Sequence, residues 1–502
     1  MRTIIDPRQN VLFDTCCSTL SPVAYKRLVN GWQGVFRHVI LSEMPVEEIG
    51  KHFSPDQGRP SSELYSMAGL LLIMEFKNWT VDEAADAYMY HAGVQYALNL
   101  GRDHQSMTTR TVERYQKLFR EQGFAAQILD RVSESLIREL ELDIKKQRLD
   151  STHVFSNMAT FTRTRMIGVV VKRFLVQLKR HHTGTYERLD EELRQRYSRS
   201  EAGLFGDVSR DQPTRQLLKQ QVAEDLYALI ELFASDKKIA GRTSYKNMVT
   251  VFEQQCEVKD GKITLKKKTG NQVMQNPSDP DATYDGHKGP GHQVQLSETC
   301  SDQNEVQLIT CAIPERAHEQ DGDALSKVIE HLEEKQMLPN ELIADTHYGS
   351  DENVQQCREI KVELTSPVAG PKPKEDPAQP TEKQQRLQAR RTEQETDEWK
   401  SRYRIRSGIE GTNSGIKRKT GLGKLRVRGV ASVDHAILMR IAGWNILRAA
   451  CSKKMQEKIR ARSRKGPLGG LIESLYGLLM APIASWKSLH PAHTSFSRWI
   501  FV

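Results

Sequence analysis

The sequence has few cysteines and no pattern that would join them. Its seven cysteines are scattered over 502 residues, and no two of them form a Cys-x-x-Cys pair. The neighbours Cys16 and Cys17 have no matching histidine or cysteine cluster elsewhere. A disulfide framework is thereby excluded, and a reduced, cytoplasmic compartment is expected.

Long apolar runs are also missing. The N-terminal MRTIIDPRQN lacks the apolar stretch of a secretory signal, so none is expected. The apolar stretches Ile167–Val171 and Leu468–Ile483 are short or broken by glycine, proline and charge, so no membrane span is predicted. With 38% apolar and 27% charged residues, the composition is that of a soluble globular protein of two or three domains.

Acidic residues are scarce in one part of the chain. The net charge of +9 and the isoelectric point near 9.0 are moderately basic. Between Arg402 and Arg440 almost every charge is lysine or arginine, and Glu410 and Asp434 are the only acidic residues. A local basic surface suits a nucleic acid, although a basic balance serves solubility equally well.

Periodicity and composition divide the chain into four segments. Residues 1–60 show little periodicity and several prolines, and are expected to form an N-terminal arm. Residues 61–145 have helical spacing, which predicts a helical N-terminal domain that is either a DNA-binding module or a simple bundle. Residues 146–450 are predicted to be an α/β domain with a helical insertion at about 160–276, and residues 451–502 a basic C-terminal tail.

Two aspartates are predicted to lie on or beside strands of the α/β domain. Asp150 lies in RLDSTHVFSNMA, a loosely alternating segment bounded by turns, and Asp345 follows the short buried strand ELIA. That strand is preceded by another strand and by an amphipathic helix whose inner face is expected to hold Leu325, Val328, Ile329 and Leu332. Functional residues gather at the carboxyl ends of strands in such units. Taken singly, each aspartate could equally be a strand-edge or helix-capping residue.

A third carboxylate occurs in the segment YRIRSGIEGTNSGIK. Four of its side chains recur at helical spacing: Tyr403, Arg406, Glu410 and Lys417. This spacing predicts that an aromatic ring, a guanidinium, a carboxylate and an ammonium share one face of a helix. A core helix shows an apolar stripe instead, so the face is either functional or simply solvated. Gly408 and Gly411 in the same segment suggest a close approach of the helix to the sheet or a substrate.

Three carboxylates that converge on one edge of a mixed sheet require cations to neutralise them. Oxygen-only ligands select hard divalent ions, Mg²⁺ or Mn²⁺. Two such ions about 3.5–4 Å apart assist an in-line phosphoryl displacement by activating the attacking oxygen and stabilising the leaving one. Basic side chains on the Glu410 helix could then bind backbone phosphates, and Tyr403 could stack on a base. His153 and His347 are expected to pack or hydrogen-bond near the site.

The three motifs together resemble the bacterial insertion-sequence transposases of the DDE class. The segment from Tyr403 to Lys417 fits the Y-R-E-K signature of that family without a gap. LDSTHV around Asp150 and IADTHYGS around Asp345 are similar to its first and second aspartate segments, although His347-Tyr348-Gly349 reverses the usual Gly-Tyr order. The long interval between the two aspartates fits the insertion predicted above.

The resemblance implies a ribonuclease-H-like catalytic core that binds double-stranded DNA, cleaves it at transposon ends and joins it to target DNA. It implies a homodimer on DNA in the bacterial cytoplasm, associated with the nucleoid. It assigns catalysis and the binding of two Mg²⁺ or Mn²⁺ ions to three carboxylates: Asp150, Asp345 and Glu410. It assigns contacts with the transposon end to three further side chains: Tyr403, Arg406 and Lys417.

Three other functions fit parts of the sequence. A nuclease or resolvase of the same fold would cleave DNA without strand transfer. A catalytically inactive DNA-binding derivative would keep the basic scaffold, but all three carboxylates are present. A two-carboxylate glycosidase is the third alternative, but this sequence lacks the aromatic residues typical of sugar-binding clefts. That function would also give Arg406 and Lys417 no role.

Overall fold

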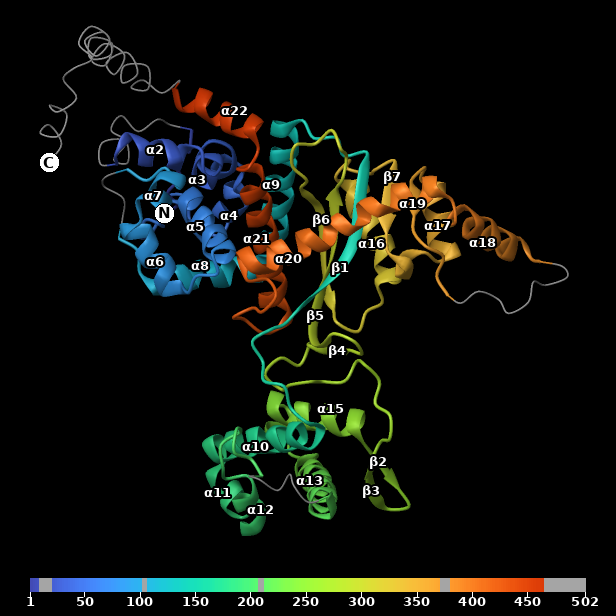
Figure 1. Ribbon diagram of the computed structural model, residues 1–502. Helices are drawn as coiled ribbons and strands as arrows, with labels where there is room; N and C mark the ends of the chain where they lie inside the picture. Colours follow the sequence, from blue (N-terminus) through green and yellow to red (C-terminus); the bar gives the residue numbers. More distant parts are fainter. Residues whose placement is uncertain (9–19, 102–105, 206–211, 371–379, 465–502) are drawn as a thin grey trace, which may run out of the picture. The chain divides into compact units, whose positions relative to one another are not determined.

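The computed structural model describes residues 1–8, 20–101, 106–205, 212–370 and 380–464. The chain forms two compact units, each drawn in Figure 1. Unit 1 comprises Met1–Asp143, Asp302–Leu308 and Met439–Val502, and unit 2 comprises Ile144–Ser301 and Ile309–Leu438. In the described ranges, no helix has the length and hydropathy needed to cross a membrane.

Unit 1 is helical. Its helices before the first strand are α2 (Pro22–Val29), α3 (Trp32–Val35), η1 (Phe36–Ile40), η2 (Leu41–Glu43), α4 (Val46–Gly50), α5 (Leu64–Phe76), α6 (Val81–Tyr90), α7 (Ala92–Ala97), α8 (Thr109–Gln122) and α9 (Phe124–Leu140). Near the C-terminus, α21 (Val430–Ala449) enters this unit and α22 (Lys453–Arg464) follows. Helix α5 is apolar and almost completely buried, as expected of a central core helix.

The predicted arm at residues 1–60 differs from the structure, because much of it is helical and packed. Phe36, Ile40 and Ile49 are fully buried in unit 1. Two of the prolines that suggested a loop stand where helices begin: Pro22 is the first residue of α2, and Pro45 directly precedes α4. Proline is favoured at such starts because its missing N–H has no partner there anyway.

The other segment boundaries stay predictions, since the two units divide the chain differently. Unit 1 takes in residues 302–308 and the stretch after residue 438, in addition to the predicted helical domain. Of the predicted tail, residues 453–464 form α22, and residues 465–502 lie outside the described residues. The neighbours Cys16 and Cys17 also lie outside them.

Unit 2 contains a six-stranded mixed sheet. Its strands are β1 (Lys146–Val154), β4 (Thr283–Asp285), β5 (Gly289–Thr299), β6 (Ile309–Arg316), β7 (Glu341–Ala344) and β8 (Glu363–Thr365). The order is β4-β5-β1-β7-β8, with β6 also paired to β5. Strand β5 runs antiparallel to β1 and β6, whereas β7 is parallel to both β1 and β8. This mixed α/β arrangement is consistent with a ribonuclease-H-like core.

Short helical segments connect the strands of the sheet. The turn η3 (Asp321–Ala324) and helix α16 (Leu325–Glu334) join β6 to β7, and η4 (Thr346–Tyr348) and α17 (Asp351–Glu359) join β7 to β8. The predicted apolar face of α16 is confirmed, because four residues at helical spacing are buried: Leu325, Val328, Ile329 and Leu332. Parallel strands joined through helices place their carboxyl ends at the same edge of the sheet.

Between β1 and β4 the chain makes a separate helical cluster. It consists of α10 (Arg163–His181), α11 (Thr183–Glu187), α12 (Glu191–Arg196), α13 (Gln212–Phe233), α14 (Lys237–Ala240), α15 (Thr243–Gln255) and a hairpin of β2 (Cys256–Lys259) and β3 (Lys262–Leu265). This cluster has its own core, which includes Ile167, Phe174, Leu226 and Met248. The hairpin turns at Asp260-Gly261, and both residues have positive φ angles, 51° and 71°.

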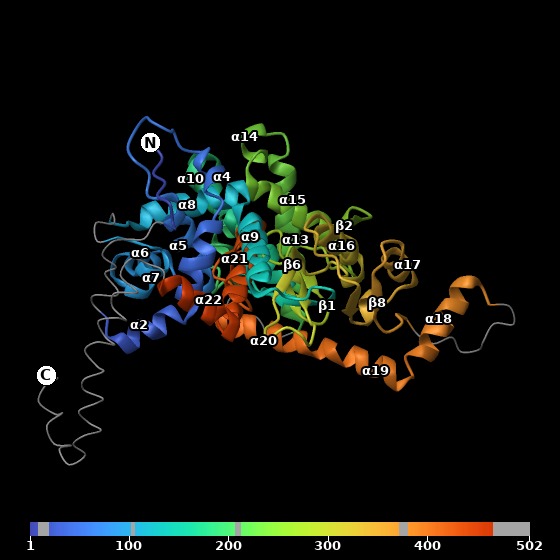
Figure 2. The ribbon, with the colours of Figure 1, turned by 90° about the horizontal axis from the view of Figure 1, so that it is seen from above.

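After β8 the chain forms several helical segments, and the single helix predicted to carry Tyr403 and Glu410 is interrupted. They are α18 (Glu382–Glu393), α19 (Asp397–Tyr403), the 3-10 turn η5 (Arg404–Ser407) and α20 (Gly408–Thr420). Figure 2 shows α18, α19 and α20 following one another as separate pieces. A 3-10 turn has three residues per turn, whereas an α-helix has 3.6. The angle between Tyr403 and Glu410 around the helix axis therefore differs from the angle predicted for one continuous α-helix.

Candidate functional site

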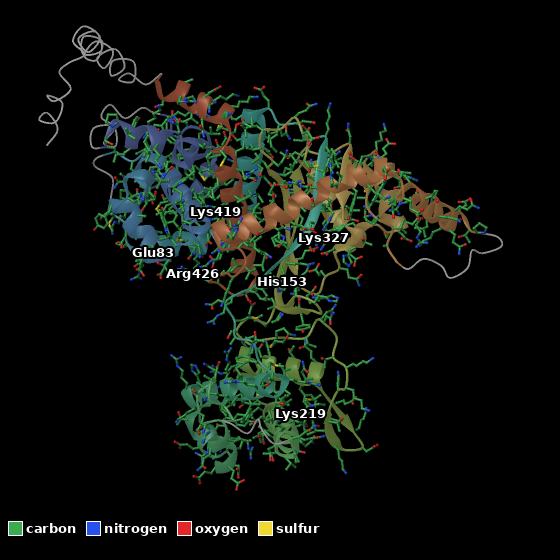
Figure 3. The ribbon with its side chains drawn as sticks, viewed as in Figure 1. Glu83, His153, Lys219, Lys327, Lys419 and Arg426 are labelled. Carbon is green, nitrogen blue, oxygen red and sulfur yellow. The ribbon has the colours of Figure 1, made fainter. Side chains whose placement is uncertain are left out.

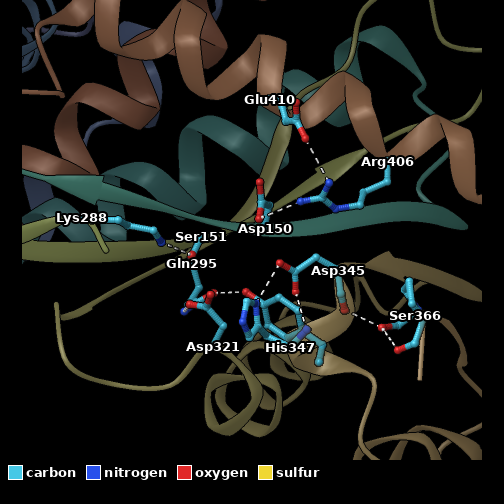
Figure 4. Close-up of polar contacts among 12 residues, drawn as sticks. Asp150, Ser151, Lys288, Gln295, Asp321, Asp345, His347, Ser366, Arg406 and Glu410 are labelled. Atoms are coloured by element: carbon cyan, nitrogen blue, oxygen red, sulfur yellow. Dashed lines mark hydrogen bonds and ion pairs between the residues drawn. The ribbon is translucent and has the colours of Figure 1, made fainter. Parts of the chain in front are cut away.

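The register between β1 and β7 brings two predicted site residues together. The parallel pairing ends at Leu149 opposite Ala344, so the next residue on each strand is an aspartate. Asp150 and Asp345 are therefore fixed beside each other by the backbone, at the carboxyl end of β7. Figure 4 shows their two side chains on neighbouring segments.

Asp150 is held in a buried, polar position. It is 9% exposed, and its carboxylate accepts hydrogen bonds from Arg406 Nη2 at 3.4 Å and from Asn413 Nδ2 at 3.3 Å. Burial raises the pKa of Asp150 to about 6, with Arg406 opposing the shift and Asp345 adding to it. A buried carboxylate next to another one favours a bound cation.

Asp345 is also the N-terminal cap of η4, the capping role that the sequence left open for it. Its Oδ1 accepts from the backbone N–H of His347 at 2.8 Å, and its Oδ2 lies 3.2 Å from His347 Nδ1. Its side chain is 21% exposed. Capping and proximity to Asp150 therefore occur together, and the cap fixes the direction of the Asp345 carboxylate.

Glu410 is linked to Asp150 through Arg406. The Glu410 side chain is 64% exposed, and it accepts from Arg406 Nη1 at 3.1 Å while the same guanidinium contacts Asp150 (Figure 4). Among the described residues, no three His, Cys, Asp or Glu side chains are grouped closely enough to hold a metal ion. The donor atoms are oxygens, as a hard divalent ion requires, but Arg406 is the cation between Asp150 and Glu410 here.

Helix α20 is anchored to the sheet by a buried ion pair that the sequence did not reveal. Arg148 on β1 lies opposite Glu298 on β5, and its guanidinium donates to that carboxylate at 2.8 and 2.5 Å. Arg148 also donates to the carbonyl of Ile405 in η5 at 3.0 Å, and Thr412 of α20 donates to Glu298 at 2.7 Å. The pair thus fixes the segment that carries Arg406 and Glu410.

Gly408 is the point of closest approach between α20 and this anchor. A Cβ atom at Gly408 would lie 1.9 Å from Arg148 Nη1, whereas one at Gly411 would meet nothing within 4 Å. The predicted close approach is therefore found at Gly408. At Gly411, which the same pattern also suggested, it is absent.

This contrast gives a matched pair of variants. Gly408→Ala is expected to lower the free energy of unfolding by about 1–3 kcal/mol, because the methyl group displaces Arg148. Gly411→Ala is expected to raise it by about 0.5–1 kcal/mol through helix propensity alone. Denaturant unfolding of both proteins measures the difference, and equal values would contradict the close contact.

Tyr403 and Lys417 flank the carboxylates from opposite ends of the segment. Tyr403 is half-buried and stacks on Trp399, with ring centroids 4.8 Å apart and an interplanar angle of 17°. Burial raises the pKa of Tyr403, and Asp345, Asp150 and Glu410 contribute, so its hydroxyl lies within their field. Burial lowers the pKa of Lys417, with Lys288 adding to the shift.

The nearby histidines and Tyr348 have supporting contacts. His153 lies towards the carboxyl end of β1 (Figure 3), and its Nε2 is 3.4 Å from the carbonyl oxygen of Pro290. Burial lowers its pKa to about 4, so this imidazole is neutral near pH 7. The buried Tyr348 hydroxyl donates to Gln295, which in turn donates to Asp321 at 3.0 Å. The reversed His-Tyr-Gly order therefore places Tyr348 in the core beneath the site.

Comparison with known proteins points to the same region. A family model described as a transposase DDE domain matches residues 347–450. The matched range contains Glu410 and begins just after Asp345. No curated protein and no solved structure gives a significant match. The family match supports a DDE-type transposase, an enzyme acting on DNA whose relatives generally use divalent metal ions.

Proposed function

We propose that the chain binds the ends of an insertion sequence, cleaves DNA there and joins it to target DNA. The observation that carries the proposal is the β1–β7 register, which sets Asp150 and Asp345 side by side. Helix α20 carries Glu410, which Arg406 links to Asp150. The proposed catalytic core is ribonuclease-H-like, with the helical cluster between β1 and β4 as its insertion.

In this proposal Asp150, Asp345 and Glu410 hold two Mg²⁺ or Mn²⁺ ions. When bound, such ions activate an attacking oxygen and stabilise the leaving oxygen of a phosphodiester. The acidic side chains have the oxygen donors that these ions prefer, and the buried Asp150 carboxylate gains most from a nearby positive charge. Binding of the ions requires Arg406 to move away from at least one carboxylate, because it now contacts two.

The chain's remaining site residues position the DNA. Arg406, once released, has a planar guanidinium suited to a backbone phosphate, and Lys417 offers a second charge. The stacked rings of Trp399 and Tyr403 offer an apolar face to a base. The neutral His153 accepts or donates a hydrogen bond without adding charge. A homodimer in the bacterial cytoplasm, associated with the nucleoid, fits a reaction that brings two DNA ends together.

The activity is tested on DNA that carries the inverted repeats bracketing the gene. Purified full-length protein with Mg²⁺ is expected to release cut ends and to join them to a second duplex, and no product is expected with EDTA. Gel analysis of labelled strands separates the two steps. Cleavage without joining would favour the alternative function, a nuclease or resolvase of the same fold. Binding without any cleavage would favour the inactive DNA-binding derivative.

A further inference from the structure

A lysine that no motif includes lies next to the first catalytic aspartate. Lys288 is in the turn between β4 and β5, and its ammonium donates to the hydroxyl of Ser151 at 3.3 Å (Figure 4). Ser151 directly follows Asp150 on β1. A turn some 140 residues further along the sequence thus supplies a positive charge beside the site.

The turn that carries Lys288 is held in a defined shape. One carboxylate oxygen of Asp285 accepts from the backbone N–H groups of His287 at 2.7 Å and Lys288 at 2.6 Å. The strands on either side pair from Asp285 opposite Gly289 to Thr283 opposite Gly291. The exposed Lys288 side chain therefore starts from a fixed backbone position, which limits the entropy lost when it binds a ligand.

Lys417, on a different element, α20, lies within the electrostatic field of Lys288. Burial is the main cause of the lowered pKa of Lys417, and the charge of Lys288 lowers it further. The pKa of His153 is also lowered mainly by burial, and the charges of both lysines add to that shift. Within the described ranges, neither lysine forms an ion pair with a carboxylate. Asp150, whose charge opposes the pKa shift of Lys417, is already bonded to Arg406 and Asn413. Asp285, whose pKa Lys288 lowers, is already bonded to backbone N–H groups of its own turn.

Two ammonium groups that lie in each other's field repel, and the repulsion is larger here because Lys417 is half-buried. An anion placed between them removes this repulsion and gains attraction to both. Phosphate is well suited, because its oxygens accept hydrogen bonds from two lysines and from a hydroxyl such as that of Ser151 at once. The arrangement therefore has the chemistry of a phosphate-binding subsite.

We infer that Lys288 and Lys417 together bind one backbone phosphate of the DNA strand whose neighbouring linkage lies at Asp150. The inference rests on the proposed function for the identity of the polyanion. It adds Lys288 as a positioning residue, since its charge fixes the strand and takes no part in bond breaking. Lys288 and Ser151 lie on one side of Asp150, and Arg406 lies on the other side (Figure 4). Lys288, together with Lys417, would hold the strand on the Ser151 side.

The test compares Lys288→Ala, Lys417→Ala, the double variant and the control Lys238→Ala, which changes an exposed lysine of α14. Binding of a fluorescent duplex carrying the element's terminal repeat is measured by anisotropy over a range of NaCl concentrations. Each single site variant is expected to lower the slope of log K against log[NaCl] by about 0.9, one phosphate contact, and to weaken binding about three- to tenfold. The double variant is expected to lose less binding free energy than the two single variants lose together, because both lysines bind the same phosphate.

A duplex with a methylphosphonate at one linkage locates the phosphate. Scanning the neutral linkage along the strand should reveal one position at which the wild type loses affinity and Lys288→Ala does not. If Lys288→Ala has the same salt slope and affinity as the control Lys238→Ala, the proposed phosphate-binding subsite is rejected, whether or not the wild type cleaves DNA. If the slope falls as expected and the wild type neither cuts nor joins DNA, the subsite stands and the proposed reaction fails.

Discussion

Asp150→Asn is expected to abolish DNA cleavage, by more than about 10³-fold in rate, while terminal-repeat binding stays within about threefold of the wild type. Asparagine has nearly the same shape as aspartate but cannot neutralise a divalent cation. Asp345→Asn and Glu410→Gln are expected to give the same loss. Single-turnover cleavage and anisotropy binding measure the two quantities separately, and Glu330→Gln on the exposed face of α16 serves as the charge-matched control.

The free energy of unfolding of each variant distinguishes a loss of catalysis from a loss of folded protein. The ionised Asp150 is disfavoured by burial, as its raised pKa of about 6 shows. Asp150→Asn removes that buried charge, so without metal the variant should be at least as stable as the wild type near pH 7. If one of the three variants cleaved DNA at a near-normal rate, the residue changed in that variant would not be catalytic.

Glu298→Ala is expected to cost about 3–5 kcal/mol of unfolding free energy, because it leaves the Arg148 guanidinium buried without its partner. The Glu298 side chain is 1% exposed and that of Arg148 is 11% exposed, so solvent cannot replace the lost carboxylate. Thr412 loses its acceptor in the same variant, which removes one of the bonds between α20 and the sheet. Urea denaturation, followed by circular dichroism, measures the cost.

The double variant Arg148→Met with Glu298→Leu separates stability from positioning. An apolar pair of similar volume commonly restores the stability of a broken buried ion pair. It cannot restore the bond from Arg148 to the Ile405 carbonyl, so α20 should stay poorly positioned and DNA cleavage should stay low. A loss below about 1 kcal/mol in Glu298→Ala would show that the pair is not the anchor.

The sequence was sufficient to predict the strands that carry the two aspartates and the apolar face of α16. These features depend on local patterns: alternation in a strand, helical spacing, and a short apolar run before Asp345. The roles of Asp150, Asp345 and Glu410 stay predictions, since they were drawn from the resemblance. The family match supports the class of enzyme, and its range, residues 347–450, begins after both aspartates.

Other features depended on pairings between distant residues. Nothing local shows that Arg148 faces Glu298, because the register of β1 against β5 is set only when the sheet forms. The break at η5 was missed because the Tyr403 to Lys417 spacing fits an ideal helix, whereas the bond from Arg148 to Ile405 accompanies a tighter turn. The hairpin at Asp260-Gly261 had a usable signal, since Asp-Gly between alternating residues is typical of such turns.

The pairing of β1 with β7 also determines which changes in chain length the protein can tolerate. Side chains alternate between the two faces of a strand, so deleting one residue within Glu341–Ala344 would turn Asp345 away from Asp150 or pull the strand out of register. Adding residues at the exposed Asp260-Gly261 turn would lengthen a hairpin outside the six-stranded sheet. Natural length variants of this chain should therefore differ in that hairpin and keep the short strand before Asp345 unchanged.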